Sequence, residues 1–543
     1  MPLWMIFPVV FAALYASHFA LLRLPYYWDE AGYYIPAAWD FYRTGSLIPL
    51  TTLSNGHPPL PSIYLALWWK SSGFLPEVTR EAVLMVASLA LLAVWRLAIR
   101  LHGSLLVAFW TVALTAIYPV WFAQSSLAHA DIFAAACTLW GFVYALPDRD
   151  RKPIASAAWF AAAALSKETA VAIPLLLAII DFAAGFRVAA PARFRLWRES
   201  AWLASSALPL VGWYLWHHAR TGYFFGNPEF FHYNAQATLE PLRILAAFGH
   251  RVLHLTAHMN LFVPVLMTFA SLLLKPQLDS AGHERQGLSR PVLRRVLLLL
   301  LANALLFSVL GGALLTRYLL PMYPLVLLLA VATFYRHVPY WQGLSLFSFA
   351  AFLVGLFVNP PYRFAPEDNL AYARVIRLHQ AGITQLNSHY RGATVLSAWP
   401  VTDELTKPEL GYVKEPYEVY RLDDFTAAEI ARAAAEPEKY SAALVFSTKY
   451  DPPQLGLSLG PKSEAMDQRY FGLHHDLPPE TIASELNGKL IWKREDRGQW
   501  IALIGFVRQA EARAGSRTKP LASGDLAWRW QPIRLGVGLL TPK

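Results

Sequence analysis

The chain begins with an apolar stretch, residues 3–24 (LWMIFPVVFAALYASHFALLRL), and continues directly into an aromatic and acidic segment, residues 26–34 (YYWDEAGYY). The first stretch is long enough to cross a hydrocarbon core of about 30 Å as a helix. The second places Asp29 and Glu30 where that helix would meet water. Charged groups at a membrane edge are costly, and a functional role is their default interpretation. The sequence therefore predicts a membrane protein with chemistry in its first loop.

The composition extends this prediction to the whole chain. Of 543 residues, 55% are hydrophobic and 15% are charged, and the mean hydropathy is +0.33, which lies outside the usual range of soluble proteins. The net charge of +10 does not indicate nucleic-acid binding, because the basic residues gather in short loops between apolar stretches. Membrane topology and anionic lipid account for such loops. The single cysteine, Cys137, excludes an intrachain disulfide.

Apolar stretches of sufficient length predict a polytopic α-helical membrane protein with about eleven spans. These lie near residues 3–24, 80–100, 105–124, 132–147, 154–166, 169–185, 200–216, 260–274, 296–315, 318–335 and 342–358. The segment 58–74 is short and opens with two prolines, so we expect it to lie along the interface, with a true span as the alternative. The distribution of Lys and Arg favours a cytoplasmic N-terminus. Asp29 then faces the outside.

The composition changes near residue 360, where charged residues become frequent and no stretch is long enough to span. We therefore predict two domains, a transmembrane domain over 1–359 and a soluble extracytoplasmic α/β domain over 360–543. Strands are expected near 394–399, 442–446, 489–492 and 500–504. Residues 426–429 (TAAE) have the spacing of a capping box, and 481–486 followed by Asn-Gly indicates a short helix with its stop.

Three acidic residues are candidates for catalysis. A carboxylate at the membrane surface can accept the proton of an acceptor hydroxyl, and Asp29, with Glu30 beside it, is the first choice for this general base. The alternative for Asp29 is a helix cap. Asp131 lies at the outer end of another span and could hold a substrate hydroxyl. With Asp29 or Glu30 it could also hold a divalent cation, Mg²⁺ or Mn²⁺, but no ligand spacing links these positions, so no metal site is assigned.

Cations are needed wherever a reaction releases a phosphate, because negative charge develops on the leaving oxygen. The candidates are His57, Lys167 and Arg317. Arg317 begins a span, where a bidentate phosphate contact is geometrically easy. An interfacial anchor is the alternative. Lys167 interrupts two apolar stretches and can pair with Glu168 or with an anionic ligand.

Aromatic side chains surround these groups, and aromatic faces suit sugar rings and interfacial lipid alike. The candidates for substrate binding are Tyr33, Tyr34, His232 and Tyr233. A further set, His250, His254 and His258, recurs at four-residue spacing, which places the three on one helix face. That set could bind a metal or a phosphate, or face lipid headgroups.

Several of these segments, in this order and between spans, resemble the GT-C glycosyltransferases. The resemblance is to the bacterial protein O-mannosyltransferase and lipid A aminoarabinose transferase group (family 39/83-like), and it covers about residues 1–335. The segments that carry it are 28–34 (WDEAGYY), 56–60 (GHPPL), Asp131, 165–168 (LSKE) and 317–321 (RYLLP). His57 stands where relatives carry lysine, and Glu168 where some relatives have glycine.

The resemblance implies a membrane-bound hexosyl- or pentosyltransferase of the cell envelope. Such an enzyme moves a sugar from a polyprenyl-phosphate carrier to a lipid, glycan or protein acceptor on the outer face of the inner (plasma) membrane. Asp29 matches the acidic residue of the group's first-loop motif. The expected partners are the donor, the acceptor and membrane lipid, without nucleic acid. A lipid or solute transporter is the alternative, but it would be expected to show internal repeats, and none is visible. A membrane scaffold that displays the outer domain is a third possibility.

Overall fold

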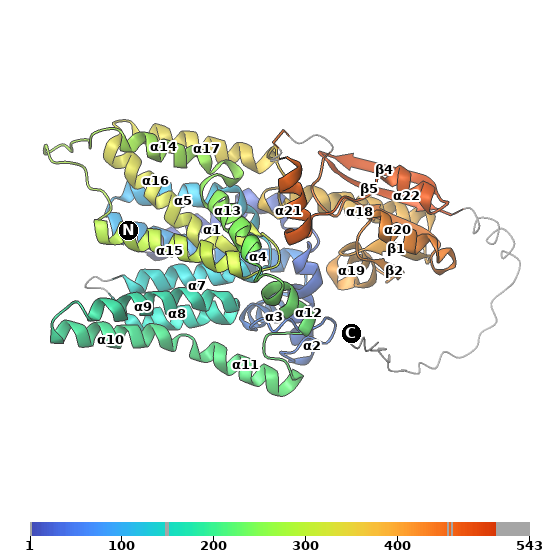
Figure 1. Ribbon diagram of the computed structural model, residues 1–543, viewed down its shortest axis with the longest axis horizontal. Helices are drawn as coiled ribbons and strands as arrows, with labels where there is room; N and C mark the ends of the chain where they lie inside the picture. Colours follow the sequence, from blue (N-terminus) through green and yellow to red (C-terminus); the bar gives the residue numbers. More distant parts are fainter. Residues whose placement is uncertain (1–2, 147–150, 453–455, 458–459, 507–543) are drawn as a thin grey trace, which may run out of the picture. The chain divides into compact units, whose positions relative to one another are not determined.

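Helices occupy the chain up to His389, and a five-stranded sheet follows from Thr394 onward (Figure 1). This computed structural model describes residues 3–146, 151–452, 456–457 and 460–506. One compact unit extends to Gly505. The predicted division into domains 1–359 and 360–543 stays a prediction, and residues 507–543 lie outside the described part of the chain.

The helices that precede the sheet carry the apolar sequence. They are α1 (Leu3–His18), α2 (Ile35–Thr44), α3 (Leu60–Ser72), α4 (Pro76–His102), α5 (Leu105–Ile117), α6 (Pro119–Gln124), α7 (Ala130–Ala145), α8 (Pro153–Ser166), α9 (Ala172–Gly185), α10 (Ala190–Ser205), α11 (Leu208–Thr221), α12 (Pro228–Phe231), α13 (Pro241–Thr256), α14 (Phe262–Leu272), α15 (Arg290–Val309), α16 (Tyr323–His337), α17 (Trp341–Phe357) and α18 (Ala371–His389). Short 3₁₀ or π turns join some of them, namely η1 (Phe19–Leu21), η2 (Glu30–Tyr34), η3 (Glu168–Val171), η4 (His232–Gln236), η5 (His258–Asn260), η6 (Thr316–Met322) and η7 (Pro366–Asp368).

Within the described residues, five helices are long and apolar enough to cross a membrane, or six if one pair bent by 98° counts as a span. The five are Leu3–Leu21, Pro76–His102, Glu168–Gly185, Arg290–Val309 and Thr316–His337, and the bent pair is Pro241–Asn260 with Phe262–Leu272. Four further expected spans form the shorter apolar helices α5, α7, α8 and α17. Residues 200–216 divide between α10 and α11. A largely helical fold with several apolar helices is therefore confirmed, whereas the count of eleven spans stays a prediction.

A proline explains why the expected span 105–124 is broken. Tyr118 has the extended backbone (φ −57°, ψ 124°) that residues before proline favour. Pro119 then opens α6, where its missing N–H costs nothing because the first helical N–H groups are unpaired anyway. The chain thus turns before α5 reaches the length of a full span. After the short helix α6, α7 begins at Ala130.

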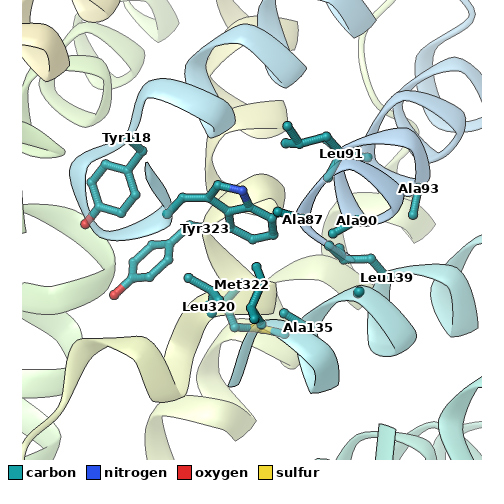
Figure 2. Packing of buried hydrophobic residues seen from close by; sticks show 14 of the residues in the cluster. Ala87, Ala90, Leu91, Ala93, Tyr118, Ala135, Leu139, Leu320, Met322 and Tyr323 are labelled. Carbon is teal, nitrogen blue, oxygen red and sulfur yellow. The ribbon is translucent and has the colours of Figure 1, made fainter. Parts of the chain in front are cut away.

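Small side chains let the central helices approach one another closely. Ala87 and Ala90 of α4 lie in the same buried cluster as Ala135 and Leu139 of α7 (Figure 2). Residues with small side chains are the common means of close helix packing in membrane proteins, where lipid is as apolar as the core. Met322 at the end of η6 joins this cluster. The packing therefore fixes η6, the element that carries Arg317.

The sheet has the strand order β2-β1-β3-β5-β4. Its strands are β1 (Thr394–Ala398), β2 (Glu418–Leu422), β3 (Ala442–Phe446), β4 (Lys489–Asp496) and β5 (Gln499–Gly505). β1 pairs in parallel with β2 and β3, while β5 pairs antiparallel with β3 and β4. The remaining elements are α19 (Val401–Thr406), η8 (Pro408–Leu410), α20 (Ala427–Ala434), η9 (Pro437–Lys439), α21 (Pro461–Phe471) and α22 (Pro479–Glu485).

The four strands expected from the sequence are confirmed, as is the short helix near 481–486. The edge strand β2 was not expected, because Glu418 and Arg421 interrupt its apolar residues. The predicted capping box at 426–429 is wrong. The side chain of Thr426 makes no capping hydrogen bond, and Glu429 instead accepts a hydrogen bond from the N–H of Asp423 at 3.0 Å.

Candidate active site

The two acidic residues of the first loop lie in an unusual backbone turn. Trp28 has φ +48°, a left-handed conformation that is uncommon for a bulky side chain. The π turn η2 follows directly at Glu30, and both features recur at functional sites. Gly32 in this turn has no room for a side chain, because an added Cβ would lie 2.9 Å from the ring of Trp399. The turn sends Asp29 into a cavity and Glu30 into the protein interior.

Glu30 is fully buried, and both oxygens of its carboxylate accept hydrogen bonds. Its carboxylate accepts hydrogen bonds from Arg80 of α4 at 2.8 and 3.0 Å. The backbone N–H groups of Ala128 and Tyr27 donate to it as well, at 2.6 and 2.9 Å. Glu30 is not among the described residues that line the cavity. The sequence placed it with the catalytic acids, but its position suits a structural tie between the first loop and α4.

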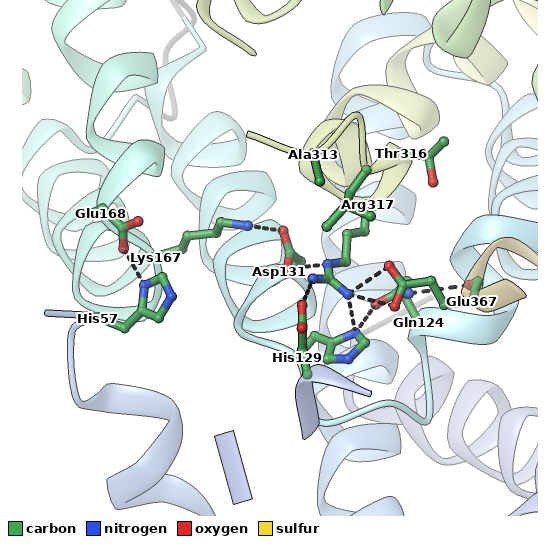
Figure 3. A network of polar contacts seen from close by, with 12 residues as sticks. His57, Gln124, His129, Asp131, Lys167, Glu168, Ala313, Thr316, Arg317 and Glu367 are labelled. Carbon is green, nitrogen blue, oxygen red and sulfur yellow. Dashed lines mark hydrogen bonds and ion pairs between the residues drawn. The ribbon is translucent and has the colours of Figure 1, made fainter. Parts of the chain in front are cut away.

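Arg317 of η6 lies at the centre of an ionic network (Figure 3). Its Nη2 donates to the carboxylate of Asp29, and its Nη1 donates to both oxygens of Glu367 at 2.7 Å. Its Nε lies 3.3 Å from Oδ2 of Asp131. Three carboxylates from distant parts of the chain thus surround one guanidinium. Only Asp29 is substantially accessible, with 34% of its side chain exposed against 2% for Asp131 and 5% for Glu367.

Lys167 extends this network to a second cation. Its Nζ lies 2.5 Å from Oδ1 of Asp131 and 3.9 Å from the centre of the Tyr318 ring. Lys167 follows the last residue of α8 in an extended conformation, which directs its side chain toward α7. Asp131 therefore bridges Lys167 and Arg317 (Figure 3). The structure brings together four of the residues that the sequence singled out, Asp29, Asp131, Lys167 and Arg317.

His57, the third candidate for a cation that binds phosphate, forms a pair with the acidic residue Glu168. Its Nδ1 lies 3.0 Å from Oε2 of Glu168 (Figure 3). The imidazole ring packs against the rings of Tyr33, Tyr34 and Phe230 at centroid distances of 5.2, 5.8 and 5.1 Å. All five residues line the cavity. The polar pair is therefore embedded in an aromatic wall.

The cavity that these groups share has a volume of about 1670 Å³, well above the ~300–1,000 Å³ of common small-molecule sites. Of the residues that the sequence predicted to bind substrate, Tyr33, Tyr34 and Tyr233 line it but His232 does not, and a role in substrate binding stays a prediction. His232 is exposed and lies 3.2 Å from Gln236 within η4. The histidines at four-residue spacing, His250, His254 and His258, all line the cavity.

The acidic residues do not have the arrangement of a cation site. Among the described residues, no group of three His, Cys, Asp or Glu side chains is placed to hold a metal ion. Arg317 and Lys167 already neutralise the carboxylates of Asp29 and Asp131. Both carboxylates are therefore paired with cations in this structure, and the Mg²⁺ or Mn²⁺ that the sequence left open stays a prediction.

Glu367 and Asp368 were missed by sequence reasoning. They form η7, after the last apolar helix. Burial, followed by the neighbouring carboxylates, raises the pKa of Glu367 to about 8, although Arg317 opposes that rise. Asp368 accepts a hydrogen bond from Thr316, and its Oδ2 lies 2.9 Å from Nε2 of His258. The only signal in the sequence is Pro-Glu-Asp-Asn at 366–369, which is an ordinary turn.

His129 completes the surroundings of Arg317. Its Nδ1 lies 3.3 Å from Nη1 of Arg317 and 2.8 Å from the side-chain oxygen of Gln124. Burial, and then the positive charges of Arg317 and Lys167, hold the pKa of His129 well below its usual value. The imidazole is therefore neutral and adds no charge to the network.

No protein-family profile matches the chain, and no curated protein matches it significantly. Among solved structures, it is similar to the crystal structure of ArnT from Cupriavidus metallidurans bound to undecaprenyl phosphate, with a TM-score of 0.51 and 14% sequence identity. The match covers 92% of this chain and 97% of that chain. This chain has the GT-C fold. The expected GT-C type of fold, with a small C-terminal sheet, is therefore confirmed, whereas the number of spans and their placement in a membrane stay predictions. A crystal structure of ArnT from the same organism in the apo state gives a TM-score of 0.49 at 16% identity, covering 91% of this chain and 97% of that chain.

Proposed function

We propose that this protein is a membrane glycosyltransferase that moves a sugar from a polyprenyl-phosphate carrier to an acceptor. The observation that carries the proposal is the convergence of Asp29, Lys167 and Arg317 at one large cavity, with the buried Asp131 in contact with both cations. The cavity combines acid groups, cations and aromatic walls, the three components that such a transfer needs. The likeness in fold to ArnT, which was crystallised with undecaprenyl phosphate, supports it.

The cations suit the phosphate of the carrier. Arg317 offers a planar guanidinium that matches two phosphate oxygens at once, and Lys167 adds a point charge. Arg317 already has three acidic partners, so an incoming phosphate must replace one of them. Asp29 is the accessible partner, whereas Asp131 and Glu367 are buried. We therefore assign the phosphate to the Nη2 side of Arg317, where Asp29 lies in this structure.

This exchange frees Asp29 to act as the general base. An acceptor oxygen then forms a bond to the anomeric carbon and passes its proton to the Asp29 carboxylate. The bond between that carbon and the phosphate oxygen breaks, and its electron pair leaves with the polyprenyl phosphate. Arg317 and Lys167 stabilise the negative charge that builds on the leaving phosphate. Asp131 holds these two cations in place.

Apolar residues of the same cavity suit the polyprenyl chain. Leu175 of α9, Leu306 of α15 and Leu253 of α13 line it beside the polar groups. These helices belong to the apolar set that is able to cross or enter a membrane. We propose that the protein lies in the inner (plasma) membrane, with the cavity on the periplasmic or extracellular side. The acceptor is a lipid, a glycan or a protein of that compartment.

Transfer is tested with purified protein, radiolabelled undecaprenyl-phosphate sugars and a membrane extract that supplies acceptors. An enzyme of this class releases undecaprenyl phosphate and labels an acceptor, whereas a transporter leaves the donor intact. Asp29→Asn should abolish release while the protein still enters the membrane. Arg317→Ala should weaken donor use. Release of undecaprenyl phosphate by Asp29→Asn at the wild-type rate would reject the assignment of the base.

A further inference from the structure

We propose that His57 and Glu168 form the subsite that binds hydroxyl groups of the transferred sugar, and that this pair helps to determine which sugar is accepted. The inference rests on the proposed function and deepens it. The sequence grouped His57 with the phosphate ligands, but in the structure His57 pairs with Glu168, whereas Lys167 pairs with Asp131 and Arg317 with Asp29.

The hydrogen bond between His57 and Glu168 has a defined direction. A carboxylate only accepts hydrogen bonds, so Nδ1 of His57 carries the hydrogen that lies between it and Oε2 of Glu168. This contact fixes the orientation of the ring. Among the described residues, Nε2 of His57 has no hydrogen-bond partner, and the residue lines the cavity. A sugar hydroxyl can both donate and accept, and therefore suits this nitrogen in either protonation state.

The pair lies next to the proposed phosphate position along the chain. Lys167 and Glu168 are consecutive, so their Cα atoms are about 3.8 Å apart. Their side chains diverge, with Lys167 reaching Asp131 and Glu168 reaching His57 (Figure 3). A sugar is bonded directly to its phosphate. If the phosphate lies at Lys167 and Arg317, the sugar ring lies beside it, within reach of Glu168 and His57.

An aromatic wall lies between the two positions. The ring of Tyr34 lies 5.8 Å from that of His57 and 5.9 Å from that of His129. His129 in turn lies 3.3 Å from Arg317. Tyr34 thus separates the phosphate side of the cavity from the sugar side. Tyr33 and Phe230 complete an aromatic surface around His57, and such faces pack against the apolar faces of sugar rings.

The test compares two kinds of ligand. One is undecaprenyl phosphate alone, and the other is undecaprenyl phosphate linked to mannose, glucose, galactose or an aminopentose. Wild-type protein should bind at least one glycosylated carrier more tightly than the bare carrier. His57→Phe keeps the ring contacts and removes both nitrogens, and Glu168→Gln keeps the shape and removes the charge. Each variant should weaken binding of the preferred glycosylated carrier by about tenfold, or about 1.4 kcal/mol. Binding of the bare carrier should stay within about twofold.

The control is Glu464→Gln, which removes a carboxylate of the same cavity that pairs with Arg363 and His475. It should change neither affinity. Arg317→Ala should weaken the binding of the bare carrier and of the glycosylated carrier equally. The proposal is overturned if His57→Phe weakens the bare carrier as much as Arg317→Ala does, or if both variants of the pair bind every carrier as the wild type does. Failure of the wild type to bind undecaprenyl phosphate would instead reject the proposed function.

Discussion

Arg317 donates a hydrogen bond to Asp29, a residue 288 positions earlier in the chain. The contact joins the first loop to the start of a late apolar helix, at the wall of the large cavity. The cation and the acid to which the proposed function assigns phosphate binding and proton transfer thus neutralise each other in this structure. Binding of the donor phosphate must compete with this ion pair.

Asp29→Asn should therefore bind undecaprenyl phosphate more tightly than the wild type. The substitution removes the carboxylate that occupies Arg317, and a gain in affinity of about twofold to fivefold is expected for one partly exposed ion pair worth about 0.5–1 kcal/mol. Isothermal titration in detergent measures it. Asp467→Asn is the matched control, because Asp467 is a similarly exposed cavity carboxylate that pairs with His250, and its affinity should not change. Weaker binding by Asp29→Asn would contradict displacement.

Glu30→Gln should lower stability sharply. Both members of its ion pair with Arg80 are completely buried, and removal of one partner from such a pair costs about 3–5 kcal/mol. The apparent melting temperature in detergent should fall by several degrees. The double variant Glu30→Leu with Arg80→Met removes both charges and should recover part of the loss, because the N–H groups of Ala128 and Tyr27 still lose their acceptor. It should also retain transfer activity; a folded but inactive double variant would restore Glu30 to the catalytic group.

Glu367 should make stability depend on pH. Burial raises the pKa of its carboxyl from an ordinary value of 4.5 to about 8, so the folded protein holds this proton more tightly than the unfolded chain. Its contribution is fully present below about pH 4.5 and is lost as the pH rises to about 8. Glu367→Gln cannot ionise and lacks this loss. The apparent melting temperature of Glu367→Gln relative to the wild type should therefore increase between pH 5 and pH 8, and parallel curves would contradict the assignment.

Chelation of divalent cations should leave transfer unchanged. Arg317 and Lys167 already neutralise Asp29 and Asp131, and they supply the charge that a metal would bring to the phosphate. Activity after treatment with EDTA should stay within about twofold of the untreated enzyme. Loss of activity that Mg²⁺ or Mn²⁺ restores, and that Ca²⁺ does not, would show that a metal takes part.

Features that depend on local pattern could be predicted from the sequence. Apolar stretches predicted the helices, and short apolar runs between turns predicted β1, β3, β4 and β5. Asp29, Lys167 and Arg317 could be singled out as candidates because each lies at the end of an apolar stretch, and spans of similar length place such ends at one depth. The breaks in the helices were harder to predict, because Pro119 changes the path of the chain without changing its apolar composition.

Features that depend on the direction of a side chain could not be predicted. Asp29 and Glu30 are neighbours with similar chemistry, and only the turn at Trp28 and η2 sends one outward and the other inward. His57 looked like a phosphate ligand because the position of Glu168 in space was unknown. Glu367 lies in a segment of ordinary composition, and its partner Arg317 is 50 positions away.

The contact between Glu367 and Arg317 limits how the protein can be divided or recombined. A chimera that joins the helices of this chain to the sheet of another at residue 360 would replace the carboxylate opposite Arg317. A junction placed after Asp368 would keep Glu367, as well as the contacts of Asp368 with Thr316 and His258. Exchange of the C-terminal part between relatives should therefore succeed only when η7 stays with the helices.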